Sequence, residues 1–132
     1  GQHAGWRRLQ KTLHSFHADV NKPNAKGWTA MMAGCRYGHE PCVRALNTAG
    51  ADVNKHDAQG WTALLIACNY GHEPCVRALI DASVDVDKPG AKGWTALMIA
   101  CNCGHEPCVR ALIDAGANVD ARNERGSTAP PP

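Results

Sequence analysis

The sequence lacks the features that mark several functional classes. Its 14 Lys and Arg residues nearly balance 12 Asp and Glu residues, so the formal net charge is only +2. A nucleic-acid binder usually carries a larger positive charge, because it must neutralise phosphates. No run of about 18 apolar residues could span a bilayer, and the first residues lack the apolar stretch of a secretory signal. We therefore expect no nucleic-acid partner, no membrane contact and no export.

Catalytic motifs are missing as well. The sequence contains no G-x-S-x-G, no phosphate-binding G-x-x-x-x-G-K-[ST] and no H-E-x-x-H, which His72-Glu-Pro-Cys75 only begins. His39, His72 and His105 recur without an acidic partner placed for general-base chemistry. We therefore predict that the chain is not an enzyme, carries no cofactor and has no small-molecule substrate. The three histidines are interpreted as structural.

What the sequence does have is an odd number of cysteines, seven, at regular positions. Six of them form two series with a spacing of 33 residues: Cys35, Cys68 and Cys101, and Cys42, Cys75 and Cys108. An odd count without an export signal favours free thiols in the cytoplasm or nucleus. Because the spacing contains no C-x2-C pair, we expect no metal ion. The cysteines are interpreted as small apolar side chains, with the Cys42 series in the apolar stripe of a helix and Cys103 facing solvent.

The spacing of the cysteines reflects a repeat that runs along the whole chain. Units of 33 residues begin at Gly27, Gly60 and Gly93, so that the predicted repeats span 27–59, 60–92 and 93–125. A partial unit covers 6–26, and 126–132 begins a truncated repeat or a tail. All lie in a single domain, 1–132, and we expect the chain to be cut from, or to end within, a longer array.

Each unit contains signals for two short helices. In the second unit Thr62 precedes the mostly apolar segment 63–69 and can cap a helix there, and Gly71 can end it. A second helix opens at His72-Glu-Pro74, with proline in its first turn. Cys75, Val76, Leu79 and Ile80 follow at helical spacing and form its apolar stripe. The Asp, Asn, Gly and Lys residues between units predict a hairpin-like turn.

These units resemble the ankyrin repeat. The resemblance rests on Gly60-Trp-Thr62-Ala-Leu64, on Ala67-Cys-Asn-Tyr-Gly71-His72 and on Gly50-Ala-Asp-Val-Asn54, and it covers roughly residues 6 to 128 in phase. It implies an all-α fold, an ankyrin-type α-solenoid of stacked antiparallel helix pairs with β-hairpin-like loops. The exposed ends of such a stack need covering. We expect the residues of the partial first unit to cover one end: Trp6, Leu9, Leu13 and Phe16.

The sequence also departs from the family pattern. Met32, Leu65 and Met98 stand where the family has a histidine that ties neighbouring units by hydrogen bonds. We therefore expect apolar packing to hold the units together there. Ser83 and Val84 replace the usual Gly-Ala pair in the middle unit. This substitution predicts local strain at that helix end.

The resemblance implies a protein partner, bound in a concave groove between the hairpin tips and the first helix of each unit. The lysines near the tips suggest that the partner presents an acidic segment. For the three tryptophans, packing between units is an equal alternative to partner binding. The residues assigned to the groove are Lys26, Trp28, Arg36, Tyr37, Gln59, Trp61, Asn69, Tyr70, Lys92, Trp94 and Asn102.

Three other interpretations stay open. The chain could be a structural spacer or targeting module of a larger protein. Its nearly identical units also fit a designed or consensus-like scaffold, although uneven changes such as Asn47-Thr48 favour a natural sequence. Finally, Asn21 and Asn54 lie in the hairpin context in which ankyrin proteins are substrates of asparaginyl hydroxylases.

Overall fold

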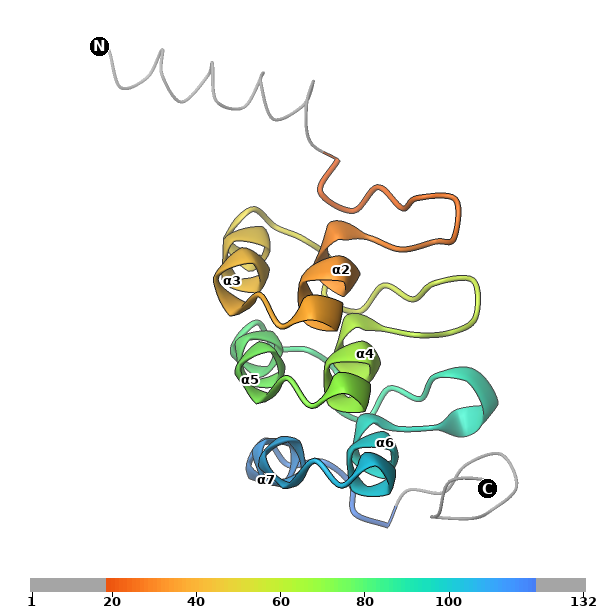
Figure 1. Cartoon of the computed structure of the whole chain (residues 1–132), viewed down its shortest axis with the longest axis vertical. Coiled ribbons are helices and arrows are strands. Elements are labelled where there is room, and N and C mark those ends of the chain that lie inside the picture. Colours follow the sequence, from red (N-terminus) through yellow and green to blue (C-terminus); the bar gives the residue numbers. More distant parts are fainter. Residues whose placement is uncertain (1–18, 121–132) are drawn as a thin grey trace.

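A computed structural model describes residues 19–120, which form three stacked layers of paired helices (Figure 1). Each layer comprises a hairpin loop, a first helix and a second helix. Helices α2, α4 and α6 form one row, and α3, α5 and α7 form a parallel row beside it. The elements are α2 (Ala30–Tyr37), α3 (Glu40–Thr48), α4 (Ala63–Tyr70), α5 (Glu73–Asp81), the 3-10 turn η1 (Ala91–Gly93), α6 (Ala96–Cys103) and α7 (Glu106–Asp114).

The hairpin loops project from one side of the stack, next to the row of first helices (Figure 1). They are called the first hairpin (22–28), the second hairpin (55–61) and the third hairpin (88–94). In the second hairpin the Asp57 amide donates to the Trp61 carbonyl at 2.8 Å. An isolated bridge between His56 and Thr62 is the β-type pairing recorded within residues 19–120. The fold is therefore all-α, as predicted.

The first helices begin and end where the sequence predicted. The Thr62 hydroxyl accepts a hydrogen bond from the Leu65 amide at 3.2 Å, which caps α4. Gly71 then ends the helix with a φ of 75°, in the left-handed region that favours glycine. The same arrangement recurs in the other two layers, with Thr29 and Thr95 as N-caps and Gly38 and Gly104 as C-caps.

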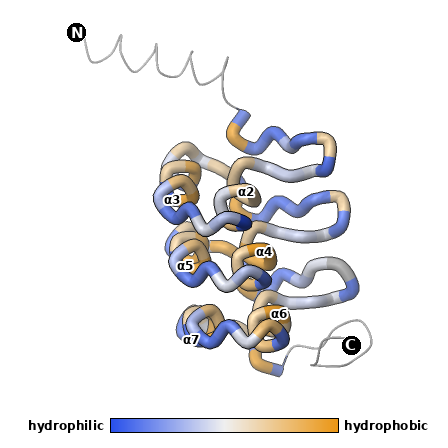
Figure 2. The backbone as a smooth tube through the Cα atoms, viewed as in Figure 1, coloured by the Kyte–Doolittle hydropathy of each residue, from blue (hydrophilic) through white to orange (hydrophobic). Residues whose placement is uncertain are grey.

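The second helices are amphipathic. In α5 Cys75, Val76 and Leu79 are fully buried, while Ile80 is half-buried at the edge of the predicted stripe. On the outer side of the helix Arg77 forms an ion pair with Glu73, four residues earlier. Figure 2 shows that hydrophobic residues lie mainly on the helices of the stack, whereas the hairpin loops are mainly hydrophilic.

The family's missing histidine is replaced by buried apolar side chains. Met32, Leu65 and Met98 are 1%, 2% and 5% exposed. Apolar packing therefore holds the layers together at these positions, as predicted.

The predicted strain lies at the end of α5. Ser83 has a φ of 62°, whereas Gly50 and Gly116 at the corresponding positions both have a φ of 86°. The left-handed region crowds the Cβ of any residue except glycine. Ser83 is therefore a locally strained residue, as expected from its replacement of glycine.

The prediction that the cysteines of the two series pack as small apolar side chains was wrong at Cys42 and Cys101, which are exposed although the other members of their series are buried. The reason is the direction of stacking. The Cys75 sulfur packs against the preceding layer, 4.0 Å from the Gly34 carbonyl oxygen. The residues that would precede the layer of Cys42 lie outside the described part of the chain. So does the predicted covering role of Trp6, Leu9, Leu13 and Phe16.

Candidate functional site

The hairpins and the first helices line one face of the stack, which we call the groove. Two hollows follow one another along the groove. Ten of the eleven residues predicted to bind a partner line one hollow or the other. Tyr70 lies at their boundary, where the Arg36 guanidinium sits 3.8 Å from the centre of its ring. The tyrosines are the most open aromatic residues of the groove, with Tyr37 64% and Tyr70 43% exposed.

The first hollow lies between the first and second hairpins and has a volume of about 670 Å³. We call it the polar hollow, because charged and amide side chains make up most of its lining. Lys26 and Gln59 stand exposed at the hairpin tips, and Arg36 reaches in from α2. Its lining residues are Asn24, Lys26, Trp28, Arg36, Tyr37, Asp57, Ala58 and Gln59.

A buried carboxylate organises the polar hollow. Asp57 is only 4% exposed, and its Oδ1 accepts hydrogen bonds from the Gln59 and Trp61 amides, both at 2.8 Å. Its Oδ2 accepts from the indole nitrogen of Trp28 at 3.0 Å. The Trp28 side chain is therefore part of the packing between layers, which is the alternative interpretation of the tryptophans.

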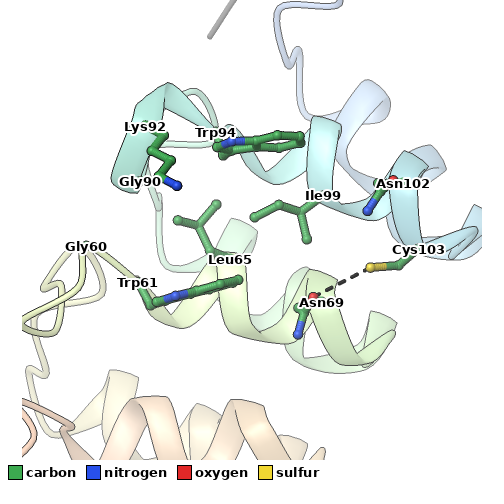
Figure 3. Close-up of a pocket in the computed structure, with 10 residues that line it drawn as sticks. All are labelled: Gly60, Trp61, Leu65, Asn69, Gly90, Lys92, Trp94, Ile99, Asn102 and Cys103. Carbon is green, nitrogen blue, oxygen red and sulfur yellow. Dashed lines mark hydrogen bonds between the residues drawn. The ribbon is translucent and has the colours of Figure 1, made fainter. Parts of the chain in front are cut away.

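The second hollow is a cleft of about 360 Å³ between the second and third hairpins. We call it the apolar cleft. The rings of Trp61 and Trp94 lie on opposite sides of it, and Leu65 and Ile99 reach into the space between them (Figure 3). Its lining residues are Gly60, Trp61, Leu65, Asn69, Gly90, Lys92, Trp94, Ile99, Asn102 and Cys103.

The two hollows differ because the sequence differs at three repeat positions. Gly90 in the third hairpin stands where the second hairpin has Asp57, so the indole of Trp61 lacks the hydrogen bond that Trp28 makes. On the helix side the Arg36–Tyr70 stack is replaced by two smaller side chains, Asn69 and Cys103. The thiol of Cys103, which is exposed as predicted, lies 3.5 Å from the Asn69 side-chain oxygen.

The recurring histidines have a structural role. Nε2 of His72 lies 3.0 Å from the Arg36 carbonyl oxygen, and Nε2 of His105 lies 3.2 Å from the Asn69 carbonyl oxygen. Each imidazole therefore joins its layer to the end of the first helix in the layer before. This confirms the structural interpretation for His72 and His105, whereas that of His39, which is exposed, stays a prediction.

The two asparagines predicted as hydroxylation sites also join successive layers. The Asn21 side-chain oxygen accepts from the Asp52 amide at 2.6 Å, and that of Asn54 accepts from the Asp85 amide at 3.0 Å. Asp87 makes the same bond to the Asn118 amide at 2.8 Å. These contacts give both asparagines a place in the fold, and their hydroxylation stays a prediction.

The sequence analysis missed several residues that shape the groove. It did not single out Asp57 or Gly90, nor the Leu65 and Ile99 side chains inside the apolar cleft. A signal was present, because the aligned position of the three hairpins reads Asn24, Asp57 and Gly90 while the residue after it is alanine in all three. Within residues 19–120, no three metal-ligating side chains come together.

Comparison with known proteins gives the class of this chain. The family model described as ankyrin repeats in three copies matches residues 4–90 and 47–123. The chain therefore belongs to the ankyrin repeat family, whose members are generally non-catalytic modules for protein–protein interaction. A search of curated proteins finds no significant match. None of the helices in the described part of the chain has the length and hydropathy to span a bilayer.

Proposed function

We propose that this chain is a non-catalytic binding module that holds a protein partner in the groove. The supporting observation is the set of accessible side chains gathered there from successive layers. Tyr37 and Tyr70 are exposed beside the guanidinium of Arg36, and Tyr and Arg are among the residues that most often anchor interfaces. The six cysteines placed in the repeat series and Cys103 all carry free thiols, which suits the cytoplasm or nucleus.

The charge of the groove favours an acidic partner. Lys26 and Lys92 are exposed at its rim, and Arg36 is half-buried between the hollows. Asp57 in the polar hollow is the one acidic residue among the lining residues of the two hollows, and it is buried and already accepts three hydrogen bonds. The accessible charge is therefore positive. Surface ion pairs of this kind weaken as salt screens them.

A pull-down from cell lysate, read by mass spectrometry, tests this function. The bait is compared with a groove variant carrying Lys26→Glu, Tyr37→Ala, Gln59→Ala, Tyr70→Ala and Lys92→Glu. Arg110→Glu on α7 serves as a control, because Arg110 is exposed on the second row of helices and, among residues 19–120, forms its ion pair with Glu106 of the same helix. Circular dichroism first establishes that all three chains fold.

The expected result is a protein that both the parent and the α7 control capture, that the groove variant loses and that high salt releases. Identical captures by all three chains would count against the groove. They would favour the spacer or targeting interpretation instead.

A further inference from the structure

The groove has two chemically different parts in successive layers. The polar hollow presents Lys26 and Arg36. The apolar cleft presents two indole rings and the Leu65 and Ile99 side chains. A partner that fills both hollows must therefore carry two kinds of group, at a spacing set by the stacking of the layers.

The apolar cleft lacks two contacts that join successive layers at the polar hollow. At the polar hollow the Trp28–Asp57 hydrogen bond joins the hairpins, and Arg36 covers Tyr70 on the helix side. At the cleft Gly90 has no side chain, and the pair Asn69 and Cys103 is smaller than Arg36 and Tyr70. The cleft is bordered instead by the two indole rings and by small polar side chains, and it opens above Leu65 and Ile99.

The cleft is suited to one large apolar side chain. Its volume of about 360 Å³ lies at the lower end of the range of ligand pockets, about 300 to 1,000 Å³. Leu65 and Ile99 are 2% and 7% exposed, so they form a firm floor. At the rim the ammonium of Lys92 and the side-chain amides of Asn69 and Asn102 supply polar groups for the main chain of a bound segment.

The spacing of the hollows sets the spacing of the groups that fill them. Packed helices lie about 8–10 Å apart, and α2, α4 and α6 are successive members of one row. A peptide in the polyproline II conformation advances about 3.1 Å per residue, and every third side chain points in the same direction. Two side chains that enter neighbouring hollows are therefore about three positions apart.

On the basis of the proposed function, we propose that the groove recognises an extended peptide segment with an acidic residue and an aromatic or large aliphatic residue about three positions apart. The carboxylate pairs with Lys26 and Arg36 in the polar hollow. The apolar side chain enters the cleft between Trp61 and Trp94. An acidic residue complements the positive charge of the polar hollow, and an apolar side chain complements the apolar lining of the cleft.

The preceding layer suggests which substitutions would close the cleft. Asn69→Arg combined with Cys103→Tyr copies the Arg36–Tyr70 pair into the next layer, where it covers the helix side of the cleft. Gly90 is a poor target, because a Cβ there would lie 2.4 Å from Leu65 Cδ1 and 2.9 Å from the Gly60 carbonyl oxygen. Lys26→Glu alters the polar hollow alone.

A random dodecapeptide library displayed on phage, selected against the parent chain, provides the probe. Fluorescein-labelled copies of the most enriched peptide are then titrated by fluorescence polarisation. We expect the enriched peptides to share the acidic and the apolar residue about three positions apart. Replacing the apolar residue by Ala, or closing the cleft, should each weaken binding at least tenfold. Lys26→Glu should weaken binding of the acidic peptide but not of its Gln-substituted form.

The outcomes separate the two proposals. Binding that Lys26→Glu weakens but the closed-cleft variant leaves unchanged overturns the inference and keeps the proposed groove function. Enriched peptides without the paired residues, or no enrichment, also overturn the inference, because it requires a linear segment. Binding that neither variant changes places the peptide outside the groove and contradicts both proposals.

An independent readout uses the thiols. Cys103 lines the cleft, whereas Cys42 is exposed on α3 at a distance from it. Bound peptide should slow alkylation of Cys103 by iodoacetamide at least fivefold and leave Cys42 unchanged, as measured by mass spectrometry of digests. Equal rates with and without saturating peptide would show that the cleft is empty in the complex, against the inference.

Discussion

The indole nitrogen of Trp28 donates a hydrogen bond to Oδ2 of Asp57 at 3.0 Å, across two successive hairpins. The other oxygen of the same carboxylate holds the turn of its own hairpin. Asn24 at the equivalent position makes the turn contacts through its Oδ1, to the Lys26 and Trp28 amides. The buried Asp57 side chain thus holds the turn of its own hairpin and also joins it to the hairpin before.

Asp57→Asn should lower the free energy of unfolding by about 2 kcal/mol. The amide oxygen of asparagine can keep the turn, as Asn24 does, but its NH2 group would then face the indole N–H and leave two donors opposed. Urea unfolding followed by circular dichroism measures the change. Asn24→Asp is the control and should change stability by less than about 0.5 kcal/mol. Equal effects of both substitutions would contradict the joining role of Asp57.

Ser83→Gly should stabilise the protein by about 1 kcal/mol, because it removes a side chain from the left-handed backbone conformation. The reciprocal change, Gly50→Ser, should destabilise it by a similar amount. A Cβ at Gly50 has nothing within 4 Å, so backbone strain alone is tested there. Thermal and urea unfolding measure both effects. A Ser83→Gly variant no more stable than the parent would show that Ser83 is not strained.

Asn47→Ile should raise the free energy of unfolding by about 1 kcal/mol. Within the described residues 19–120 the side-chain oxygen of Asn47 is buried without a hydrogen-bond partner, although its amide nitrogen donates to the Ala78 carbonyl at 3.1 Å. The corresponding residues of the next two layers are Ile80 and Ile113, so the fold accepts isoleucine there. Asn47→Ala is the control, since it removes the same polar group without adding apolar contacts. If the isoleucine variant is the less stable of the two, the site is too tight for it.

Stability should fall as pH rises above about 9, because the buried thiol of Cys68 resists losing its proton. A hydrogen bond with Cys108, followed by burial, raises the pKa of the Cys68 thiol above its ordinary value of 9.0. The folded thiol therefore keeps its proton at a pH where the unfolded thiol loses it. The unfolded state then binds fewer protons, and the free energy of unfolding falls by about 1.4 kcal/mol per pH unit for this group.

Urea titrations of the parent and of Cys68→Ala at a series of alkaline pH values measure this effect. Alanine is the family's usual residue at this position, and it does not titrate. The variant should lose stability less steeply than the parent, while both should be insensitive to the thiol below pH 8, about one unit under its ordinary pKa. Parallel curves for the two proteins above pH 9 would show that Cys68 is not held protonated in the folded state.

Much of the fold could be predicted from local signals. The cap of α4 needs only Thr62 and Gly71, and the apolar stripe of α5 needs only helical spacing, so both could be predicted from a single unit. The strain at Ser83 was also predictable, because the aligned glycines reveal which backbone conformation the position requires. The exposure of Cys42 could not be predicted in this way, because it depends on what is stacked before its layer.

The groove was predicted in outline, but its division into two hollows was not. Aligned tryptophans suggested three equivalent side chains, yet Trp28 is tied to Asp57 and Trp61 faces an open cleft. The difference lies in residue 90 of the next hairpin, a neighbour in space that is 29 positions away from Trp61 in the sequence. A repeat alignment shows which residue changes, but only the stacking shows what that residue contacts.

The change from Asp57 to Gly90 also bears on how the solenoid bends. The first two layers are joined by the Trp28–Asp57 bond, the Arg36–Tyr70 stack and an ion pair between Arg44 and Asp81 at 3.0 Å. At the corresponding places the next two layers have the Lys88 ammonium on the Asn54 carbonyl at 2.6 Å and the weaker contact of the Cys103 thiol with the Asn69 side-chain oxygen at 3.5 Å. Because each layer contacts only its neighbours, the stiffness of the array is set joint by joint. We therefore expect elastic deformation to concentrate between α4 and α6, where a bending stack widens or narrows the mouth of the cleft.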